Sequence, residues 1–366
     1  MKSAKIPAIF VLAFLMIFIS SCSEDEVIVT PENPQEPETL YGAFVLCQGT
    51  ESYPQERYIG FYDLLKEEYE LNIYKPGLLP YAPRSIIYHN GSLYISNSTL
   101  MVYSQSKVLK VGAWGSEQGT LQLEQNKFYV PNLLFSFNDH IGLTYFYPQE
   151  SFTGTLEFMD PGHIGVVTEF PNIKGFITDH VYYDNKLYLT SSTYSPEFKD
   201  SSVISISLPD TSVSKVYLGG KPGALILLNN NMLLAACTEG ISTFYYVNPA
   251  TLQKTDSVTY QNGFKKDLVF DHNRNYIYFI SADDKIVKFN PVQKTFTTFI
   301  SNPFSADNYI FNSINFDPHS GKLFVLYSSN STYVAGKMQI YSSQGYFEKT
   351  LTIGKNPIQI VFAKEN

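Results

Sequence analysis

The sequence has little charge and few of the residues on which most enzyme sites depend. Charged residues make up 16% of its 366 residues, and it contains only three cysteines, six histidines and one tryptophan. It has no His-Glu-x-x-His, Cys-x-x-Cys, phosphate-binding glycine loop or Gly-x-Ser-x-Gly elbow. The strongest enzymatic signatures are therefore missing.

Positive charge is also scarce. Lysine and arginine number 26 against 34 acidic residues, which gives a net charge of −8, and no basic cluster is present. Because neutralising phosphates requires clustered lysine and arginine, this composition argues against a nucleic-acid partner. The 44% of hydrophobic residues, with 15% aromatic, are enough apolar surface to indicate a folded chain.

The first residues have the order of an export signal. Lys2 and Lys5 precede the apolar run 6–19, which is too short for a comfortable membrane span, and small residues lead to Cys22. The stretch Ile-Ser-Ser-Cys that ends at Cys22 resembles a bacterial lipobox, in which the cysteine becomes the lipidated first residue. An uncleaved anchor is the alternative. We therefore expect a lipoprotein signal peptide at 1–21 and lipidation at Cys22.

Residues 22–39 are rich in acids and proline, which predicts an extended, disordered tether. A serine followed by acids directly after Cys22 resembles the surface-export signal of outer-membrane lipoproteins. Removing residues 1–21 deletes two lysines and no acid, so the mature charge becomes 24 − 34 = −10. We expect a lipid-anchored protein at the outer membrane that faces the cell exterior and contacts the membrane through its lipid only.

From residue 40 onward, short β-branched and aromatic runs alternate with polar turns, and no stretch has sustained helical periodicity. A hairpin recurs, as in the apolar strand 86–88, the turn 89–92 and the second strand 93–96. The first apolar residue after each turn recurs every 44 to 48 residues. These anchor residues are Leu93, Ile141, Leu187, Leu233, Ile277 and Leu323.

The two ends of this region complete one further unit. The segment 42–47 matches the second strand of the hairpin at Phe44 but lacks a first strand, which the segment 356–362 would supply. A four-stranded sheet of about 45 residues cannot bury both faces alone, but a ring of such sheets can. Residues 40–366 are therefore predicted to form an all-β, seven-bladed β-propeller of four-stranded antiparallel blades, closed by pairing of its C-terminal and N-terminal strands. An open solenoid is the alternative.

The remaining cysteines, Cys47 and Cys237, could in principle form a bridge in an oxidising exterior. The repeat places them in different blades, across the ring from each other. We therefore expect two unpaired thiols.

The hairpin pattern, the period near 46 residues, the strand Gly-Ala-Phe-Val-Leu at 42–46 and the export signal together resemble the surface lipoproteins built on seven-bladed YVTN-type β-propellers. The resemblance covers residues 40–366. The YVTN letters themselves are replaced by Leu-Tyr-Ile-Ser, Leu-Tyr-Leu-Thr, Ile-Tyr-Phe-Ile and Leu-Phe-Val-Leu. Some relatives of this kind hand vitamin B12 or related corrinoids to a transporter, and the resemblance implies such a capture role here.

Candidate binding residues come from the loops that enter each inner strand and those that leave the second strand, which share one face of a propeller. Exposed tyrosine and phenylalanine offer large, rigid contact area for a ringed ligand, a glycan or a protein loop, although they can equally pack on one another. His180, at the start of an inner strand, is a weaker candidate. The ligand-face candidates are Tyr53, Arg57, Arg84, Tyr145, Tyr147, Phe152, His180, Tyr194, Phe198, Lys265, Tyr309, Phe311 and Tyr333.

A channel enzyme is the alternative from another class. Propeller lyases and hydrolases assemble metal or acid–base sites from carboxylates on separate blades, and Asp179, Asp267 and Asp307 lie near the starts of inner strands. Asp283 and Asp284 follow a second strand and give a weak cation signal. Four histidines fall in hairpin turns, where a turn role is favoured, and His163 indicates a loop. The turn histidines are His89, His140, His272 and His319.

These patterns predict a surface lipoprotein that binds a ligand without catalysis, as a nutrient-capture protein for an outer-membrane transporter. The family resemblance makes a corrinoid the leading ligand, with a glycan the next. The sequence indicates no cofactor and no metal. The alternatives are a propeller lyase or hydrolase and a glycan- or protein-binding surface scaffold.

Overall fold

The computed structural model describes residues 40–50, 56–74, 77, 79–98, 106–122, 130–146, 153–162, 164–192, 201–238, 241–331 and 333–364. The chain divides into the units Met1–Leu40 and Tyr41–Asn366. All strands of the described residues belong to the second unit. Among the described residues, no helix is long and apolar enough to cross a membrane.

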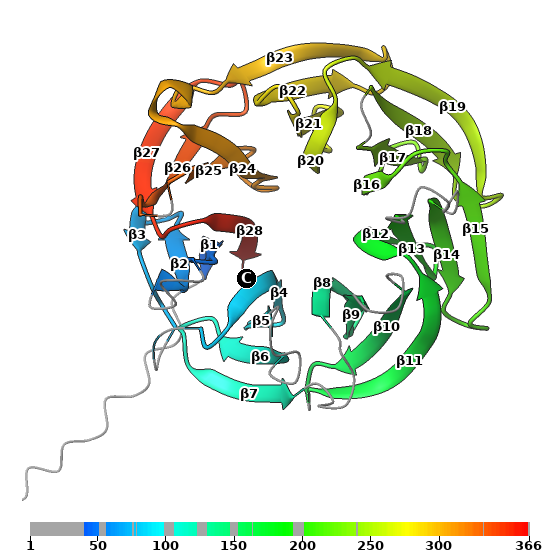
Figure 1. The fold of residues 1–366 in the computed structure, drawn as a ribbon, viewed down its shortest axis with the longest axis horizontal. Helices are drawn as coiled ribbons and strands as arrows, with labels where there is room; N and C mark the ends of the chain where they lie inside the picture. The colour runs from blue at the N-terminus through cyan, green and yellow to red at the C-terminus, as the bar shows by residue number, and fades with distance from the viewer. Residues whose placement is uncertain are drawn as a thin grey trace, which may run out of the picture. The chain divides into compact units, whose positions relative to one another are not determined.

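The second unit is a ring of seven four-stranded antiparallel sheets, as the repeat predicted (Figure 1). In six of these blades the strands follow the chain outward from the central axis. We number them blades 2 to 7. Their strands are β4 (Ala82–His89), β5 (Ser92–Ser98), β6 (Lys107–Gly112), β7 (Glu117–Gln122); β8 (Val130–Phe137), β9 (His140–Phe146), β10 (Thr153–Asp160), β11 (Gly165–Lys174); β12 (Phe176–Tyr183), β13 (Lys186–Ser192), β14 (Ser202–Ser207), β15 (Val213–Tyr217); β16 (Pro222–Leu227), β17 (Leu233–Cys237), β18 (Ser242–Asn248), β19 (Gln253–Tyr260); β20 (Phe264–Asp271), β21 (Tyr276–Ser281), β22 (Lys285–Asn290), β23 (Thr295–Ser301); and β24 (Tyr309–Phe316), β25 (Leu323–Ser329), β26 (Gly336–Tyr341), β27 (Phe347–Ile353).

Blade 1 joins the two ends of the ring. Its order is β28 (Pro357–Lys364), β1 (Tyr41–Cys47), β2 (Tyr58–Asp63) and β3 (Glu68–Glu70), which confirms the predicted closure. β1 pairs with β28 from Tyr41 opposite Lys364 to Cys47 opposite Pro357. This register aligns Ala43, rather than Phe44, with the anchor residues of the other blades, because Ala43, Val45 and Cys47 face the same core cluster.

The core lies between the blades, since each sheet buries both faces against its neighbours. Between blades 5 and 6, the ring of Phe244 lies 5.2 Å from that of Phe279 and 5.5 Å from that of Phe289. Between blades 7 and 1, Phe324 packs on Tyr62 and Phe362. Large aromatic side chains fill the wedge that opens between radially arranged sheets, which accounts for the aromatic content of the sequence.

Hydrogen bonds from tyrosine link successive blades. In three places a tyrosine hydroxyl donates to the carbonyl of a proline in the outer turn of the next blade. The pairs are Tyr94 to Pro161 (2.9 Å), Tyr188 to Pro249 (3.0 Å) and Tyr246 to Pro291 (2.6 Å). Each bond satisfies a polar group that the packing would otherwise bury unpaired.

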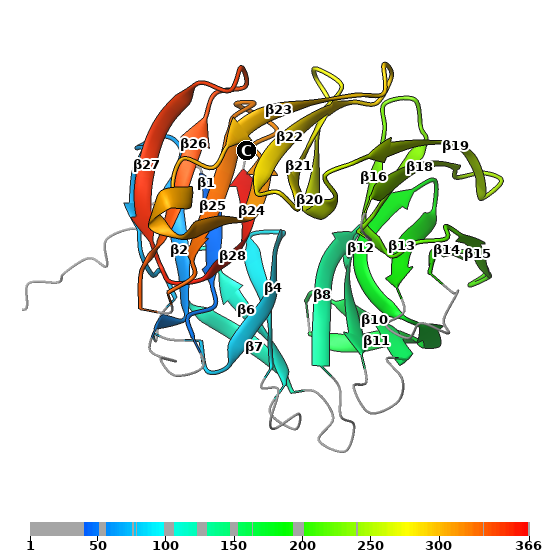
Figure 2. The same cartoon turned by 45° about the horizontal axis from the view of Figure 1, so that its top comes forward.

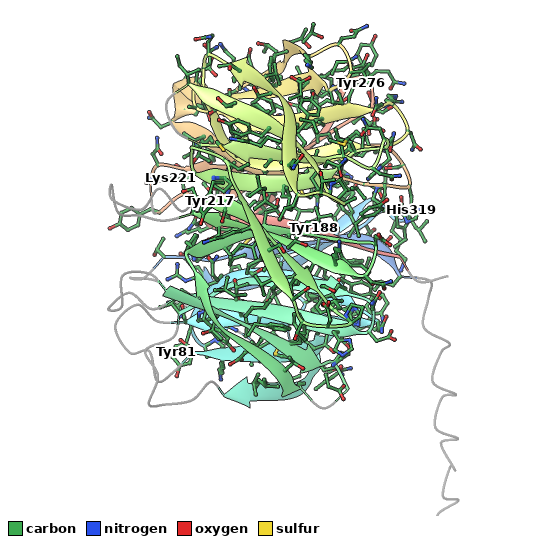
Figure 3. All side chains as sticks on the ribbon, turned by 90° about the vertical axis from the view of Figure 1, so that its right-hand side faces the viewer. Tyr81, Tyr188, Tyr217, Lys221, Tyr276 and His319 are labelled. Atoms are coloured by element: carbon green, nitrogen blue, oxygen red, sulfur yellow. The ribbon has the colours of Figure 1, made fainter. Side chains whose placement is uncertain are left out.

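The ring has two distinct faces. The inner strands begin on one of them, which we call the upper face, and the turns within the inner and outer hairpins lie on the other, the lower face. Figure 3 shows Tyr81 and Lys221, which precede inner strands, on one side and His319 and Tyr276, at inner hairpin turns, on the other. The two remaining cysteines, Cys47 in blade 1 and Cys237 in blade 5, are both buried and neither forms a disulfide, as predicted.

Candidate functional site

A central channel is the site that the whole ring helps to form. It encloses about 340 Å³, and all seven inner strands contribute to its wall. Figure 2 shows these strands, β4, β8, β12, β16, β20, β24 and β28, arranged around the centre of the ring. The lining residues are Arg84, Ser85, Asn132, Leu133, Phe176, Thr178, Asp179, Gly223, Ala224, Asp267, Leu268, Val269, Ser313, Ile314, Asn315, Ile358, Gln359 and Ile360.

Every inner strand has a register shift at the same height. A β-bulge leaves a residue without a ladder partner and turns its side chain, so seven bulges at one level re-aim a belt of side chains. The unpaired positions lie within Pro83–Ser85, Pro131–Leu134, Ile177–His180, Pro222–Ala224, Phe264–Leu268, Phe311–Ser313 and Pro357–Gln359. We call this level the bulge belt.

Asp179 is a bulge residue of β12 whose carboxylate is fixed by two backbone donors. Its Oδ2 accepts from the N–H of Leu225 in β16 at 2.8 Å, and its Oδ1 accepts from the N–H of His180 at 2.8 Å. Its side chain keeps 29% exposure. The carboxylate therefore ties blade 4 to blade 5 and still faces the channel.

Asp267 has the same role two blades further on. Its Oδ2 accepts from the N–H of Ile314 in β24 at 2.8 Å, and no donor of the described residues bonds Oδ1. Its φ of 52° lies in the left-handed region, which aspartate and asparagine tolerate better than most side chains. One oxygen of Asp267 is thus available to a ligand.

Other polar side chains of the bulge belt bond the next inner strand in the same way. Gln359 accepts from the N–H of Ile86 at 3.0 Å, and Ser85 accepts from that of Leu134 at 3.2 Å. Beyond the belt in β24, Asn315 also bonds the next inner strand, where its Nδ2 donates to the carbonyl of Ile360 at 2.9 Å. Because each side chain is held by a neighbouring blade, the channel wall is organised before any ligand arrives.

The charges of the channel are distributed unevenly around it. Asp179 and Asp267 belong to blades 4 and 6, on either side of blade 5, whose belt residues Gly223 and Ala224 bear no polar side chain. Arg84, in blade 2, supplies a guanidinium whose Nε donates to Ser98 Oγ at 3.2 Å. The wall therefore presents carboxylates on one side and a cation on the other.

Two neighbouring groups have opposite pKa shifts. Burial raises the pKa of Asp179 to about 7, with a smaller contribution from the charge of Asp267. Burial lowers the pKa of His180 to about 4. The His180 ring stacks on Phe135 at 4.3 Å, and its Nδ1 lies 3.9 Å from Asp179 Oδ1 without a hydrogen-bond partner.

These shifts predict a pH dependence of stability. A raised pKa at Asp179 means that the folded state holds the proton more tightly, so this group makes stability fall as pH rises from about 4 to about 7. A lowered pKa at His180 makes stability rise with pH over about 4 to 6.5, so the two effects oppose each other.

Replacing His180 by Phe keeps a ring on Phe135 and removes one of the two effects. The free energy of unfolding of His180→Phe is expected to fall with rising pH, by up to about 1.4 kcal/mol per pH unit. The wild-type profile should be flatter. Urea denaturation at several pH values measures both profiles, and a variant profile as flat as that of the wild type would contradict the assignment.

The structure corrects four of the predicted ligand-face residues, which are buried instead of exposed, three of them in strands and Arg57 in the loop before β2. Tyr145 lies in β9 and donates to Glu157 Oε2 at 2.5 Å. Tyr309 and Phe311 lie in β24, where the Tyr309 hydroxyl donates to the carbonyl of Ala335 at 3.0 Å. Arg57 donates to the carbonyl of Pro80 at 3.1 Å. These three aromatic side chains are buried because β9 ends later and β24 begins earlier than the sequence pattern indicates.

The remaining candidates lie in several different places. Arg84 lines the channel, and His180 packs on Phe135 of blade 3 instead of facing the channel. Lys265 and Tyr333 are exposed on the upper face. The others lie outside the described residues, namely Cys22, Tyr53, Tyr147, Phe152, Tyr194 and Phe198.

The predicted acidic cluster is only partly brought together. Asp179 and Asp267 line the channel, but Asp307 lies exposed in the short 3-10 helix Ser305–Asp307. Asp284 instead accepts from the N–H of Phe311 at 3.0 Å, and Asp283 pairs with Lys285 at 2.7 Å. The described residues contain no group of three or more His, Cys, Asp or Glu side chains that could hold a metal ion.

Sequence reasoning missed the uncharged part of the channel wall. Asn132, Thr178, Asn315 and Gln359 all line the channel. The available signal was a polar residue at the same place in otherwise apolar inner strands, as in the strand 357–362, where Gln359 stands among isoleucines. No shared letter connects these positions, so only the coordinates reveal that they form one ring.

Comparisons with known proteins show the fold. No protein-family model matches the sequence. No curated protein matches it either. Among solved structures, a 6-phosphogluconolactonase-like protein from Bacteroides uniformis is 13% identical, with a TM-score of 0.61 over 88% of this chain and 99% of its own.

Two further solved structures are similar in fold at comparably low sequence identity. Apo AztD from Citrobacter koseri is 11% identical, with a TM-score of 0.51 over 89% of this chain and 98% of its own. Hydrazine synthase from Kuenenia stuttgartiensis is 10% identical, with a TM-score of 0.59 over 75% of this chain and 87% of its own. Identities this low show a shared β-propeller architecture and carry no information on activity.

Proposed function

We propose that this protein is a non-catalytic binding propeller that captures a small nutrient at the upper mouth of its channel. The observation that supports this best is the bulge belt, which turns polar side chains from separate blades toward one lumen. A concave site with a few fixed polar groups is the usual form of a small-molecule site. The belt is held by hydrogen bonds between blades, so binding requires little reordering.

The family resemblance makes a corrinoid the leading ligand. A channel of about 340 Å³ can admit a substituent of such a ligand but not its macrocycle. The macrocycle would therefore lie across the upper mouth, with its amide side chains toward Asp267, Asn132 and Gln359. A glycan, whose hydroxyl groups suit the same carboxylates and amides, is the second ligand class.

The proposed location is the cell surface, with a lipid on Cys22 and an outer-membrane transporter as the acceptor of the ligand. This follows from the export signal and the acidic tether in the sequence. β1 begins at Tyr41 on the lower face, whereas the channel mouth proposed to bind the ligand is on the upper face. A chain anchored through its N-terminal segment would thus present the mouth away from its point of attachment.

Isothermal titration with cyanocobalamin and with a panel of neutral oligosaccharides tests the proposal. Binding by either class supports nutrient capture, and no heat from either class contradicts it. Replacing Asp267 by Asn keeps an oxygen for the N–H of Ile314 and removes the charge that faces the channel. Because a hydrogen bond donated to a charged group contributes about 1.5–3 kcal/mol, Asp267→Asn is expected to weaken binding about 10- to 100-fold.

Asp210→Asn is the matched control. Asp210 lies exposed in the outer turn of blade 4 on the lower face. Loss of the charge at Asp210 should leave the affinity for the ligand unchanged. Equal affinities for the two variants would place the binding site outside the channel.

A further inference from the structure

The lower face has an arc of exposed apolar side chains at its rim. They lie in or beside the outer turns of three consecutive blades, between β26 and β27, between β2 and β3, and between β6 and β7. Their exposed fractions are 74% for Tyr346, 56% for Phe347, 64% for Leu65 and 51% for Trp114. We call these four residues the lower arc.

The outer turns of blades 3, 4 and 5 differ from those of the lower arc. Their described exposed residues are small or polar, as at Gly162, Asp210 and Thr251. Blades 3 and 4 expose Val166 and Val213 just after their turns, and blade 6 exposes Val292, all smaller side chains than those of the lower arc. Large apolar side chains are thus gathered on one side of the ring, and such a gathering indicates a contact surface rather than scattered exposure.

The turn that presents Trp114 is held firmly. The N–H of Gly115 donates to the carbonyl of Gly112 at 2.8 Å, and a Cβ atom added to Gly115 would lie 1.5 Å from the carbonyl oxygen of Ile73. Gly115 also has a φ of 86°, which favours glycine. The edge of the Trp114 ring lies against Phe61, at 6.2 Å between centroids. The indole is therefore exposed in a fixed position.

The arc is continuous with the place where the chain enters the ring. The N–H of Leu64 donates to the carbonyl of Tyr41 at 3.0 Å, so the turn that bears Leu65 is adjacent to the start of β1. Lys349 Nζ, in the strand that begins with Phe347, donates to the carbonyl of Glu67 in the same turn at 2.6 Å. Blade 1, where the chain enters, is thus the middle of the three blades.

We propose that the lower arc rests on the surface of a lipid bilayer. This rests on the lipid anchor of the proposed function and replaces the expectation that the protein contacts the membrane through its lipid only, because the chain enters the ring from its N-terminal segment at the centre of this arc. Tryptophan and tyrosine favour the membrane interface, where an aromatic ring meets both lipid and water. Leucine and phenylalanine favour burial about 5–10 Å into the boundary between headgroups and acyl chains.

The net negative charge makes apolar contact the more suitable mode of docking. At −10 after removal of residues 1–21 (24 − 34), attraction to an anionic membrane is disfavoured. Shallow insertion of four apolar side chains needs no such attraction. With the arc on the bilayer, the channel mouth on the opposite face points toward the medium.

Trp114 is the only tryptophan in the chain, so its fluorescence reports on the arc alone. The full chain, produced in a Gram-negative host and extracted in detergent, is reconstituted on phosphatidylcholine vesicles with and without brominated acyl chains. Flotation measures anchoring. On unbrominated vesicles, the expected result is a blue shift of the tryptophan emission. On vesicles with brominated acyl chains, most of the emission intensity should be quenched.

Paired variants separate docking from anchoring. Leu65→Glu combined with Tyr346→Glu should float as the wild type does but lose the quenching and the blue shift. Val213→Glu, a change at an exposed aliphatic residue of blade 4, should keep both. In the variant with Trp114→Phe and Tyr333→Trp, the tryptophan lies on the upper face and should not be quenched.

Each contrary outcome has a distinct meaning. A wild-type chain that floats with unquenched tryptophan keeps its lipid anchor and overturns the docking of the arc. Quenching that survives in the double glutamate variant also overturns it, since the contact then lies elsewhere. A chain that does not float lacks the anchor, and both the proposed location and the docking fail.

Discussion

Deletion of β28 (Pro357–Lys364) is expected to abolish cooperative folding of the whole ring. β28 is the innermost strand of blade 1 and pairs with β1 over the whole length of that strand. Its loss exposes an unpaired edge at β1 and uncovers Val45 and Phe324, which are fully buried. Each fully buried apolar side chain contributes about 1.5–3 kcal/mol, so the loss of several approaches the typical total stability of about 5–15 kcal/mol.

Thermal unfolding followed by circular dichroism, with size-exclusion chromatography, tests this expectation. The truncated chain should show no sharp transition and should associate through its open edge. Removal of residues 365 and 366 alone is the control and should leave the melting temperature unchanged. A synthetic peptide of residues 355–366 should restore the transition by adding the missing strand. An unchanged, cooperative melt of the truncated chain would contradict closure of the ring at blade 1.

Phe244→Ala is expected to lower the free energy of unfolding by about 3–5 kcal/mol. The side chain of Phe244 is fully buried between blades 5 and 6. Its ring lies 5.5 Å from that of Phe296 and 6.0 Å from that of Phe264, in addition to the contacts with Phe279 and Phe289. Truncation leaves a cavity whose aromatic walls cannot collapse without moving two sheets.

The matched control is the same truncation at Phe347, whose side chain is 56% exposed. It should change stability by no more than about 0.5 kcal/mol. Guanidinium denaturation measures the free energy of unfolding of both variants. An m-value equal to that of the wild type shows that only stability has changed. Equal losses for the two variants would contradict the inter-blade core as the main source of stability.

Part of the candidate site could be predicted from the sequence. Asp179 and Asp267 were singled out as carboxylates near the starts of inner strands, and both line the channel. Asp307 had the same sequence context, yet it lies in a 3-10 helix outside the channel. The difference lies in where each inner strand begins, which local pattern does not resolve.

The aromatic candidates show the same limit. Tyr145 and Phe311 were predicted on the ligand face because they were assigned to loops that leave a second strand or enter an inner strand, but both are buried. Tyr333, which also follows a second strand, is 68% exposed. Whether an aromatic ring packs between blades depends on the adjacent sheet, which is contributed by residues far away in the chain.

The sequence by itself determined the all-β class, the number of blades and the joining of the two ends. These follow from an apolar period near 46 residues and from two half-units that complement each other, and both are local, repeated signals. Only the tertiary structure decided the bulge belt, the fixing of Asp179 and Asp267, and the lower arc. Each of these depends on bonds or packing between neighbouring blades, such as that of Asp179 with Leu225, 46 residues apart in sequence. A one-residue change of register alters which side chains face the channel, and register is set by pairing across strands rather than by the order of residues along one of them.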